Sequence, residues 1–318
     1  MTTAKLEVIH AGPQVSLQDQ GRFGKLRYGV PASGPMDRFA FSIANLALGN
    51  PADSTAIEVS LGGLAVRCTD HPVNFAVAGG DFQVFIDKTA LSAWCVATLQ
   101  AGETLSIRPG RWGSWCYLAF AGHLQGNHWL GSFSTHGSSG LGGGLLVAGG
   151  KIDIEHADPP LDINASLTCP VSARPRHSVR VVLGPQIQFF GSDTRQTLLS
   201  QPFTLTDAYD RMGVHLSGPP LRIDAILDMP SEPIVRGSIQ VAGDGVATVL
   251  LADHQTTGGY PKIATILSDD LDGFVQLRSR DQVCFVAIDA KTAVAATRTR
   301  HKSRSDYLTL FGQISRIK

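Results

Sequence analysis

Residues 246–267 have the sequence VATVLLADHQTTGGYPKIATIL. Two mostly apolar runs, 246–251 and 263–267, enclose a polar segment that contains two glycines and a proline. Runs of this length with β-branched side chains are typical of short strands, and a glycine-containing polar segment between them is typical of a hairpin turn. The stretch therefore predicts two strands that end at a polar rim.

The same pattern recurs along the 318-residue chain, which contains 34 glycines and 17 prolines. These residues interrupt the chain at short intervals, as expected for short strands joined by tight turns. Because the apolar runs do not alternate with long helical periods, we predict a mainly β protein rather than a doubly wound α/β fold. Further strand candidates are residues 73–77, 82–86, 104–107, 115–120, 179–183 and 283–288.

Two segments have helical periodicity. In residues 35–48 the apolar side chains recur at steps of three and four, which predicts a helix, and a weaker pattern covers 185–199. Residues 158–177 contain four prolines and no regular period, so we predict a linker between an N-terminal domain, 1–157, and a C-terminal domain, 178–290. The basic tail, 291–318, is expected to form a short helix or a mobile terminus.

Charge and cysteine content argue against several classes of protein. The 27 basic and 27 acidic side chains cancel, which gives no basic stripe for nucleic acid. The sequence has no signal-peptide pattern and no apolar run long enough to predict a membrane segment. We therefore expect a cytoplasmic protein. The five cysteines form no C-x-x-C pair, and three histidines at 123, 128 and 136 lack ligand spacing. We therefore predict no metal site and no disulfide framework.

The richest polar segment is the hairpin 253–262, DHQTTGGYPK. Gly258 and Gly259 would let backbone N–H groups approach a ligand, and Lys262 could neutralise a carboxylate or phosphate. An alternative is a long turn whose polar side chains satisfy only their own backbone. The side chains expected to orient a bound group by hydrogen bonds are Gln255, Thr256 and Tyr260.

A second polar cluster lies near the N-terminus. Asp19 and Arg22 have the spacing of an ion pair across a turn, for which a structural role is favoured, and Gln18 precedes them. Asp37 is expected to interact with a helix dipole.

Glu58 lies in an apolar strand, and a carboxylate that is buried alone is costly. It therefore needs a partner, and the arginine expected for this role is Arg22 or Arg211.

The glycine-rich run 137–150 has two readings. Its main-chain N–H groups could cradle phosphate, or its glycines could simply allow turns between strands. Because it lacks the lysine and the Ser/Thr of a nucleotide-binding loop, we favour the second reading. The sequence also contains no G-x-S-x-G, P-loop or H-E-x-x-H motif, so a self-contained hydrolase or P-loop ATPase is not expected.

Several motifs resemble the biotin-dependent carboxyltransferase or allophanate hydrolase subunit 2 family, in the expected order over nearly the whole chain. They are QDQGRFG at 18–24, GVPASGPMD at 29–37, ANLALGN at 44–50, YLA at 117–119, GSFST at 131–135, RMG at 211–213, GSIQ at 237–240 and DHQTTGGYPK at 253–262. The resemblance implies two cyclophilin-like β-barrel units with a few short helices. It also implies a partner similar to allophanate hydrolase subunit 1.

In the arrangement that the resemblance implies, these two polypeptides and a third, hydrolase-like subunit hydrolyse 5-oxoproline to glutamate with ATP. We expect ATP in the complex and no covalent biotin on this chain, which has no M-K-M attachment motif. Alternatives are a carboxyltransferase component of a urea or other amide carboxylase, and a non-enzymatic antagonist that binds a kinase inhibitor. Turnover in the presence of ligand would separate the enzyme from the antagonist.

For this activity the expected catalytic residues are Lys262 and Arg211, which supply charge, and Tyr260. The expected substrate-binding residues are Gln240, Asp253, Gln255, Thr256, Thr257, Gly258 and Gly259.

Some positions depart from the family pattern. His215 and Gly144 stand where the family would supply arginines, Gly150 replaces an aspartate, and Val246-Ala247 replaces Gln-Pro. Losing two arginines would remove anion-binding charge, so the departures bear on the substrate more than on the fold.

Overall fold

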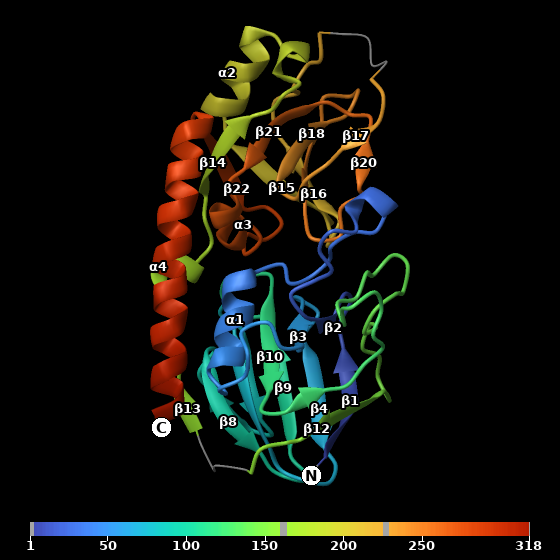
Figure 1. The fold of residues 1–318 in the computed structure, drawn as a ribbon, viewed down its shortest axis with the longest axis vertical. Helices are drawn as coiled ribbons and strands as arrows, with labels where there is room; N and C mark the ends of the chain where they lie inside the picture. Colours follow the sequence, from blue (N-terminus) through green and yellow to red (C-terminus); the bar gives the residue numbers. More distant parts are fainter. Residues whose placement is uncertain (1–2, 160–163, 225–228, 318) are drawn as a thin grey trace. The chain divides into compact units, whose positions relative to one another are not determined.

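The protein is described by a computed structural model that covers residues 3–159, 164–224 and 229–317, with side chains described as far as residue 313. The chain forms two compact units. The N-terminal unit contains residues 1–22, 33–174 and 305–318, and the barrel unit contains residues 23–32 and 175–304. Figure 1 shows the two units as a ribbon and labels many of their helices and strands.

The N-terminal unit is built from two antiparallel sheets whose facing sides form one core. One sheet has the order β11 (His123–Leu124), β12 (Lys151–Glu155), β1 (Ala4–Ala11), β4 (Leu64–Cys68), β9 (Thr104–Arg108), β6 (Gln83–Ile86), β7 (Thr89–Leu91). The other has the order β13 (Asn164–Ser166), β8 (Cys95–Leu99), β5 (Val73–Ala78), β10 (Cys116–Phe120), β3 (Ala56–Val59), β2 (Ser16–Gln18). Inward side chains such as Leu6 and Val66 of one sheet, and Phe75 and Leu118 of the other, are almost fully buried. Alternation along the strands places these apolar residues on one face.

Helix α1 (Arg38–Leu46) packs with the second sheet in a separate apolar cluster that contains Phe39 and Tyr117. The helix begins at Arg38 because the Asp37 carboxylate accepts hydrogen bonds from the N–H groups of Phe39 at 3.0 Å and Ala40 at 2.9 Å. This is N-capping, so the role expected for Asp37 at the start of a helix is found.

The barrel unit contains a closed barrel of seven strands, in which β14 and β22 pair in parallel and complete the ring. The order is β14 (Ser178–Leu183), β21 (Lys262–Ile266), β18 (Ser238–Val241), β19 (Ala247–Leu250), β16 (Gly213–Ser217), β15 (Phe203–Tyr209), β22 (Gln282–Ala287). A two-stranded sheet of β17 (Glu232–Pro233) and β20 (Thr257–Gly258) lies in the same unit. The remaining helices of the chain are α2 (Ser192–Ser200), α3 (Ser268–Phe274) and α4 (Ala290–Ile317), and short 3-10 turns are η1 (Leu26–Tyr28), η2 (Val171–Ala173) and η3 (Ile187–Phe189).

The mainly β prediction is confirmed, and each strand candidate overlaps a strand of the structure. The β-barrel fold class is confirmed as well: the barrel unit contains the closed barrel, and the N-terminal unit contains two antiparallel sheets that share one core. A sheet closes only when its first and last strands pair, and β14 and β22 do so.

Two further segments differ from expectation. Part of the expected linker is β13, which pairs with β8, and the structure also contains η2 there; residues 160–163 of the linker lie outside the described residues. The basic tail is a 28-residue helix, α4, rather than a short one. Tyr307 and Phe311 explain part of this difference, because they pack in the apolar cluster of α1 and stabilise the end of the helix.

Candidate functional site

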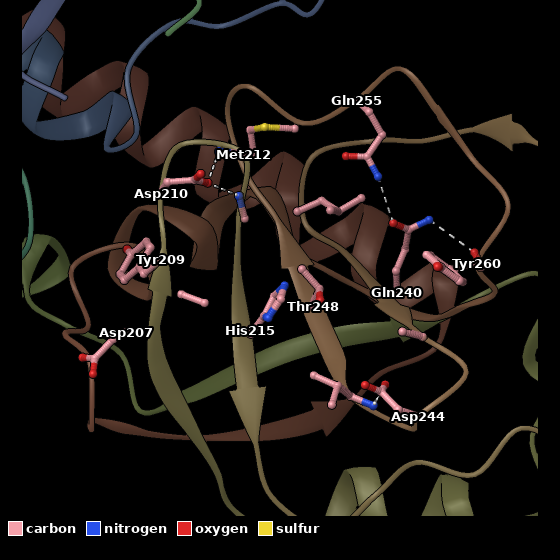
Figure 2. A pocket seen from close by; sticks show the side chains of 15 residues that line it. Asp207, Tyr209, Asp210, Met212, His215, Gln240, Asp244, Thr248, Gln255 and Tyr260 are labelled. Carbon is pink, nitrogen blue, oxygen red and sulfur yellow. Dashed lines mark hydrogen bonds between the residues drawn. The ribbon is translucent and has the colours of Figure 1, made fainter. Parts of the chain in front are cut away.

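A cavity of about 720 Å³ lies on the outer surface of the barrel, over strands β15, β16, β19 and β18. Strand alternation puts it there: Val214 and Val249 are fully buried in the barrel core, so their neighbours His215 and Thr248 face outward. Figure 2 shows His215, Thr248 and Gln240 together in the wall of this cavity. Its volume is in the range of small-molecule sites.

Gln240 is the centre of a hydrogen-bonded row on one side of the cavity. Its Oε1 accepts from Nε2 of Gln255 at 3.2 Å, and its Nε2 donates to the backbone oxygen of Tyr260 at 3.2 Å. All three residues line the cavity, and Figure 2 shows both bonds. The polar segment 253–262 therefore reaches the cavity through Gln255 and Tyr260. The expected hairpin is wrong, because β18 lies between the flanking strands β19 and β21 in the barrel.

Because Gly258 has no side chain, it leaves room for Gln240 to make these hydrogen bonds. A Cβ atom at Gly258 would lie 2.8 Å from Nε2 of Gln240 and 2.6 Å from Cδ1 of Ile234, closer than non-bonded atoms tolerate. The sequence predicted that both glycines allow close approach to a ligand. The structure shows that Gly258 allows a close approach of Gln240, whereas a Cβ at Gly259 would have its nearest contact, 3.4 Å away, with Met229.

Several polar groups in the cavity wall are available to a ligand. Within the described ranges 3–159, 164–224 and 229–317, no hydrogen bond is made by Oε1 of Gln255, the hydroxyls of Tyr260 and Thr248, or the ring of His215. The Tyr260 side chain is half exposed and His215 is exposed. These groups can accept and donate hydrogen bonds, which suits recognition of an amide.

Arg211 and Asp253 form a buried ion pair at the start of the segment 253–262. Nε and Nη2 of Arg211 donate to the two carboxylate oxygens of Asp253 at 2.9 and 3.0 Å, and the N–H of Asp253 donates to the backbone oxygen of Arg211 at 2.8 Å. The side chains are 5% and 2% exposed. A bidentate pair of this kind fixes the relative position of the two segments that it connects. It therefore holds the RMG turn at 211–213, which carries Met212 of the cavity wall, against the segment 253–262.

Lys262 lies away from the cavity lining. Its buried ammonium is 3.3 Å from Oε2 of Glu232 and 3.4 Å from the backbone oxygen of Pro233. Gln186 completes this cluster, because its side chain donates to Glu232 and accepts from the backbone N–H of Lys262. The structure thus places Lys262 beside a carboxylate that partly offsets its charge, in a different environment from Arg211 and Tyr260.

The remaining residues of the segment 253–262 bond to backbone groups. Thr257 and Gly258 form β20 and pair with β17, and the backbone oxygen of Thr256 accepts from Ile234 at 3.1 Å. His254 is buried and bonds through Nδ1 to the backbone oxygen of Gln255 at 2.7 Å. Burial lowers the pKa of His254, and nearby Arg236 lowers it further.

The cavity has an acidic side. Asp207, Asp210 and Asp244 line it, and none of its described lining residues is a lysine or arginine. Each carboxylate already accepts a hydrogen bond: Asp207 from the hydroxyl of Ser279, Asp210 from the Met212 N–H at 2.7 Å, and Asp244 from the Val246 N–H at 3.0 Å. His215 is therefore the described lining residue that can carry a positive charge.

The second polar cluster of the sequence forms a network in the N-terminal unit. Asp19 accepts from the hydroxyls of Ser132 at 2.5 Å and Ser134 at 2.6 Å, and from the N–H groups of Gly21 and Phe133. Burial acts to raise the pKa of Asp19, but these hydrogen bonds outweigh it and hold the pKa below its usual value. The network ties the motif at 18–24 to the motif at 131–135.

Arg22 takes part in this network through a different contact from the one expected. Its guanidinium donates to the backbone oxygen of Ser134 and lies over the ring of Trp129, 4.8 Å from the centroid. Gln18 donates to Ser16 at 2.9 Å and to the backbone oxygen of Thr135 at 3.1 Å. These contacts hold a loop to strand β2, and the structure thus gives Gln18, Asp19 and Arg22 structural contacts.

Glu58 is fully buried on β3. Its Oε2 accepts from the Met36 N–H at 2.7 Å and from the Tyr117 hydroxyl at 2.8 Å. Burial raises the pKa of Tyr117 well above its usual value, and the nearby Glu58 charge raises it further. Glu58 thus holds the turn before α1 against the second sheet.

Sequence reasoning missed Glu232, Gln186 and the three aspartates of the cavity. Glu232 and Gln186 are 30 and 76 positions from Lys262 and carry no local signal that connects them. Asp210 had a usable signal, because an aspartate three residues before a glycine, as in Asp210–Gly213, is typical of a tight turn.

The part of the chain that the structure describes contains no cluster of three or more His, Cys, Asp or Glu that could hold a metal ion. Among the described helices, none is both long and apolar enough to cross a membrane.

The fold and the outer cavity define a β-barrel protein with a polar site that contains two glutamines, and comparisons with known proteins place it in a family. The family described as "Carboxyltransferase domain, subdomain A and B" matches residues 28–287. The chain belongs to this family, which confirms the resemblance found in its motifs.

Two relatives match nearly end to end, and both are the C component of a 5-oxoprolinase. The chain is 30% identical to the protein from Haemophilus influenzae over 295 residues, 92% of this chain and 94% of the relative. It is 30% identical to the protein from Escherichia coli over 313 residues, 98% and 97% of the two chains. Urea amidolyase of Saccharomyces cerevisiae is also 30% identical, over 91% of this chain and 17% of its own length.

Solved structures show the same fold. The urea carboxylase of Kluyveromyces lactis superposes with a TM-score of 0.85 at 24% identity, over 96% of this chain and 29% of that chain. The protein TTHA0988 superposes with a TM-score of 0.79 at 30% identity, over 89% of this chain and 55% of that chain. This chain therefore spans about half of one structural neighbour and less than a third of the other.

Proposed function

We propose that this chain is one component of an ATP-dependent 5-oxoprolinase, which hydrolyses 5-oxo-L-proline to L-glutamate in the cytoplasm. It would act as part of a heteromer with a partner similar to allophanate hydrolase subunit 1 and a third, hydrolase-like polypeptide. Two relatives named as the C component of 5-oxoprolinase, aligned over more than nine-tenths of the chain, support this proposal. The observation that supports a site for this activity is the hydrogen-bonded row of Gln255, Gln240 and Tyr260 in the cavity wall.

The chemistry of a lactam matches these groups. A lactam presents an N–H donor and a carbonyl acceptor, and we assign Oε1 of Gln255 to the N–H and the hydroxyl of Tyr260 to the carbonyl. A hydrogen bond to that oxygen becomes stronger as negative charge develops on it, which lowers the barrier to attack by water. His215 would receive the carboxylate of 5-oxoproline, since it is the described lining residue that can be positively charged.

Arg211 and Lys262 have different proposed roles from Tyr260. The buried ion pair of Arg211 and Asp253 positions the segment 253–262 and does not contact the substrate. Lys262 pairs with Glu232 and so holds the C-terminal end of the segment 253–262 in place. Both residues remain part of the proposed site as positioning residues.

The proposed reaction uses ATP because an amide is a poor electrophile, and the nucleotide would act on another polypeptide of the heteromer. The outer cavity does not fit a triphosphate, because Asp207, Asp210 and Asp244 line it and its described lining includes no lysine or arginine. We therefore assign no nucleotide step to this cavity.

The same three aspartates favour a second candidate function. A cavity with carboxylates accepts a neutral amide such as urea more readily than an anion, which fits a carboxyltransferase that acts on urea or another neutral amide. The yeast urea amidolyase match supports this alternative. It requires a biotin carrier and a biotin carboxylase on other polypeptides or domains.

The test is reconstitution of the chain with its partner polypeptides, ATP and 5-oxoproline, with glutamate as the measured product. Gln255→Ala should lower kcat/KM by about tenfold or more, the loss expected for a hydrogen bond made in the transition state. Gln201→Ala is the matched control, because Gln201 is exposed at the end of α2 and does not line the cavity. No glutamate from the wild-type complex, with transfer of carboxyl to urea instead, would replace the first proposal by the second.

A further inference from the structure

A second hollow in the barrel unit has the opposite charge from the outer cavity. It has a volume of about 620 Å³ and lies between one face of α4 and the segment that carries Arg176, just before β14, and Arg180, on β14. On α4 the lining residues Thr292, Thr299 and Ser303 recur at steps of seven and four, which places them on one face of the helix. We call this hollow the arginine groove.

Three arginines line the groove: Arg176, Arg180 and Arg300. Arg180 donates to both carboxylate oxygens of Asp270, at 2.9 and 2.7 Å, and Arg176 donates to one of them at 3.3 Å. One buried carboxylate is thus shared by two guanidinium groups whose side chains remain about one-third exposed. The groove therefore carries more positive than negative charge.

Arg300 has donors to spare. Its guanidinium makes no hydrogen bond and no ion pair with any residue of the described chain. Asp269 is close enough for Arg300 to act on its charge, but burial dominates there and raises the pKa of Asp269. Residues 290–304 of α4 add further basic side chains and contain no acidic residue.

The lining chemistry selects an anion with several oxygen acceptors. A guanidinium group presents planar, paired N–H donors that match phosphate oxygens, and the hydroxyls of Thr299 and Ser303 add further donors. The hydroxyl of Thr292 donates to Asp289 at 2.6 Å instead. Ala295 and Ala296 leave space beside the helix because they have small side chains. The described lining contains no aromatic side chain on which a nucleotide base could stack.

We propose that the arginine groove binds a small phosphate-bearing anion through Arg176, Arg180 and Arg300, and that the phosphate group is what it recognises. The site is separate from the outer cavity, and its lining residues are all different. It does not depend on the proposed hydrolase activity, because ligand binding can be measured without turnover. If ATP acts in the complex, this groove has the charge that the outer cavity lacks.

The test is calorimetric titration of the full chain with pyrophosphate, orthophosphate and ATP, each in a buffer of low ionic strength. We expect saturable binding of at least pyrophosphate. Arg300→Gln should weaken it by about tenfold to a hundredfold, the loss expected for a charge-assisted hydrogen bond. Arg300 has no hydrogen-bond partner in the described chain, so the variant should fold, which a melting curve would check.

Arg298→Gln is the matched control, because Arg298 is an exposed arginine on the same helix that does not line the groove. It should leave the dissociation constant within about twofold. Equal affinity for pyrophosphate and ATP would support recognition of phosphate alone, and tighter binding of ATP would support a nucleotide as the ligand. Absence of saturable binding of all three anions, or equal weakening by the two substitutions, would overturn the proposal.

Discussion

Replacing Gly258 by alanine tests whether Gln240 must occupy its observed position. The new Cβ would lie 2.6 Å from Cδ1 of Ile234 and 2.8 Å from Nε2 of Gln240, about 1 Å inside ordinary contact distance. Both atoms are the ends of side chains. The side chains can therefore rotate away, and the backbone of β20 does not have to move.

The magnitude follows from these contacts. An off-rotamer side chain costs about 0.5–1.5 kcal/mol, so two of them cost about 1–3 kcal/mol of stability. Rotation of Gln240 also breaks its 3.2 Å bonds to Gln255 and to the backbone of Tyr260, each worth about 0.5–1.5 kcal/mol net. If the row orients the substrate amide, kcat/KM should fall by about tenfold, which corresponds to about 1.4 kcal/mol.

The assay is glutamate production by the reconstituted complex, together with a denaturant titration of the isolated chain. Gly259→Ala is the control, since its Cβ would lie 3.4 Å from the nearest atom and the backbone there is not left-handed. It should retain wild-type turnover. A Gly258→Ala variant that turns over normally, or a Gly259→Ala variant that is equally impaired, would refute the assignment of Gln240 as a positioning residue.

Three other predictions concern stability and reactivity. Asp253→Asn should destabilise the chain by about 3–5 kcal/mol in a urea titration, because it leaves Arg211 buried without its counter-ion, and a loss below about 1 kcal/mol would contradict the buried pair. The pKa of Asp19 is lowered in the folded chain, so its carboxylate stabilises the fold at neutral pH, and this stabilisation is lost as the pH falls through the lowered pKa. Asp19→Asn should therefore flatten the acid limb of a curve of unfolding free energy against pH. An unchanged acid limb would count against this assignment. Burial raises the pKa of Cys95 to about 12, so iodoacetamide at pH 8 should label exposed Cys284 first, as followed by peptide mass spectrometry, and equally fast labelling of Cys95 would exclude a buried thiol.

Local patterns were sufficient for the strands and for α1. Alternating or continuous apolar runs identify strands because burial of one face depends on residues two positions apart. The start of α1 is a local event as well, since Asp37 caps N–H groups two and three positions along the chain. The polar segment 253–262 was recognisable for the same reason, because turn chemistry is set by adjacent residues. The hairpin expected there was wrong, since β18 pairs with both β19 and β21 and lies between them.

Long-range pairing was beyond such patterns. The sequence singled out Lys262, but Glu232 and Gln186 reach it from distant segments. The expected pairing of Asp19 with Arg22 gave way to serines more than 100 positions away, because these hydroxyls donate to the carboxylate in the folded chain. The length of α4 was underestimated, since its packing against α1 is a tertiary effect.

The amino-acid sequence by itself determined the mainly β class, the polar segment 253–262 and the motifs of the carboxyltransferase family, because each depends on residues close together in the chain. Only the tertiary structure decided that one unit closes into a barrel through β14 and β22, and that Gln255, Gln240 and Tyr260 meet on its outer surface. It also placed Arg176 and Arg180 beside Arg300 of α4. The physical reason is that hydrogen bonds and charge act over a few ångströms in space, whatever the separation along the chain.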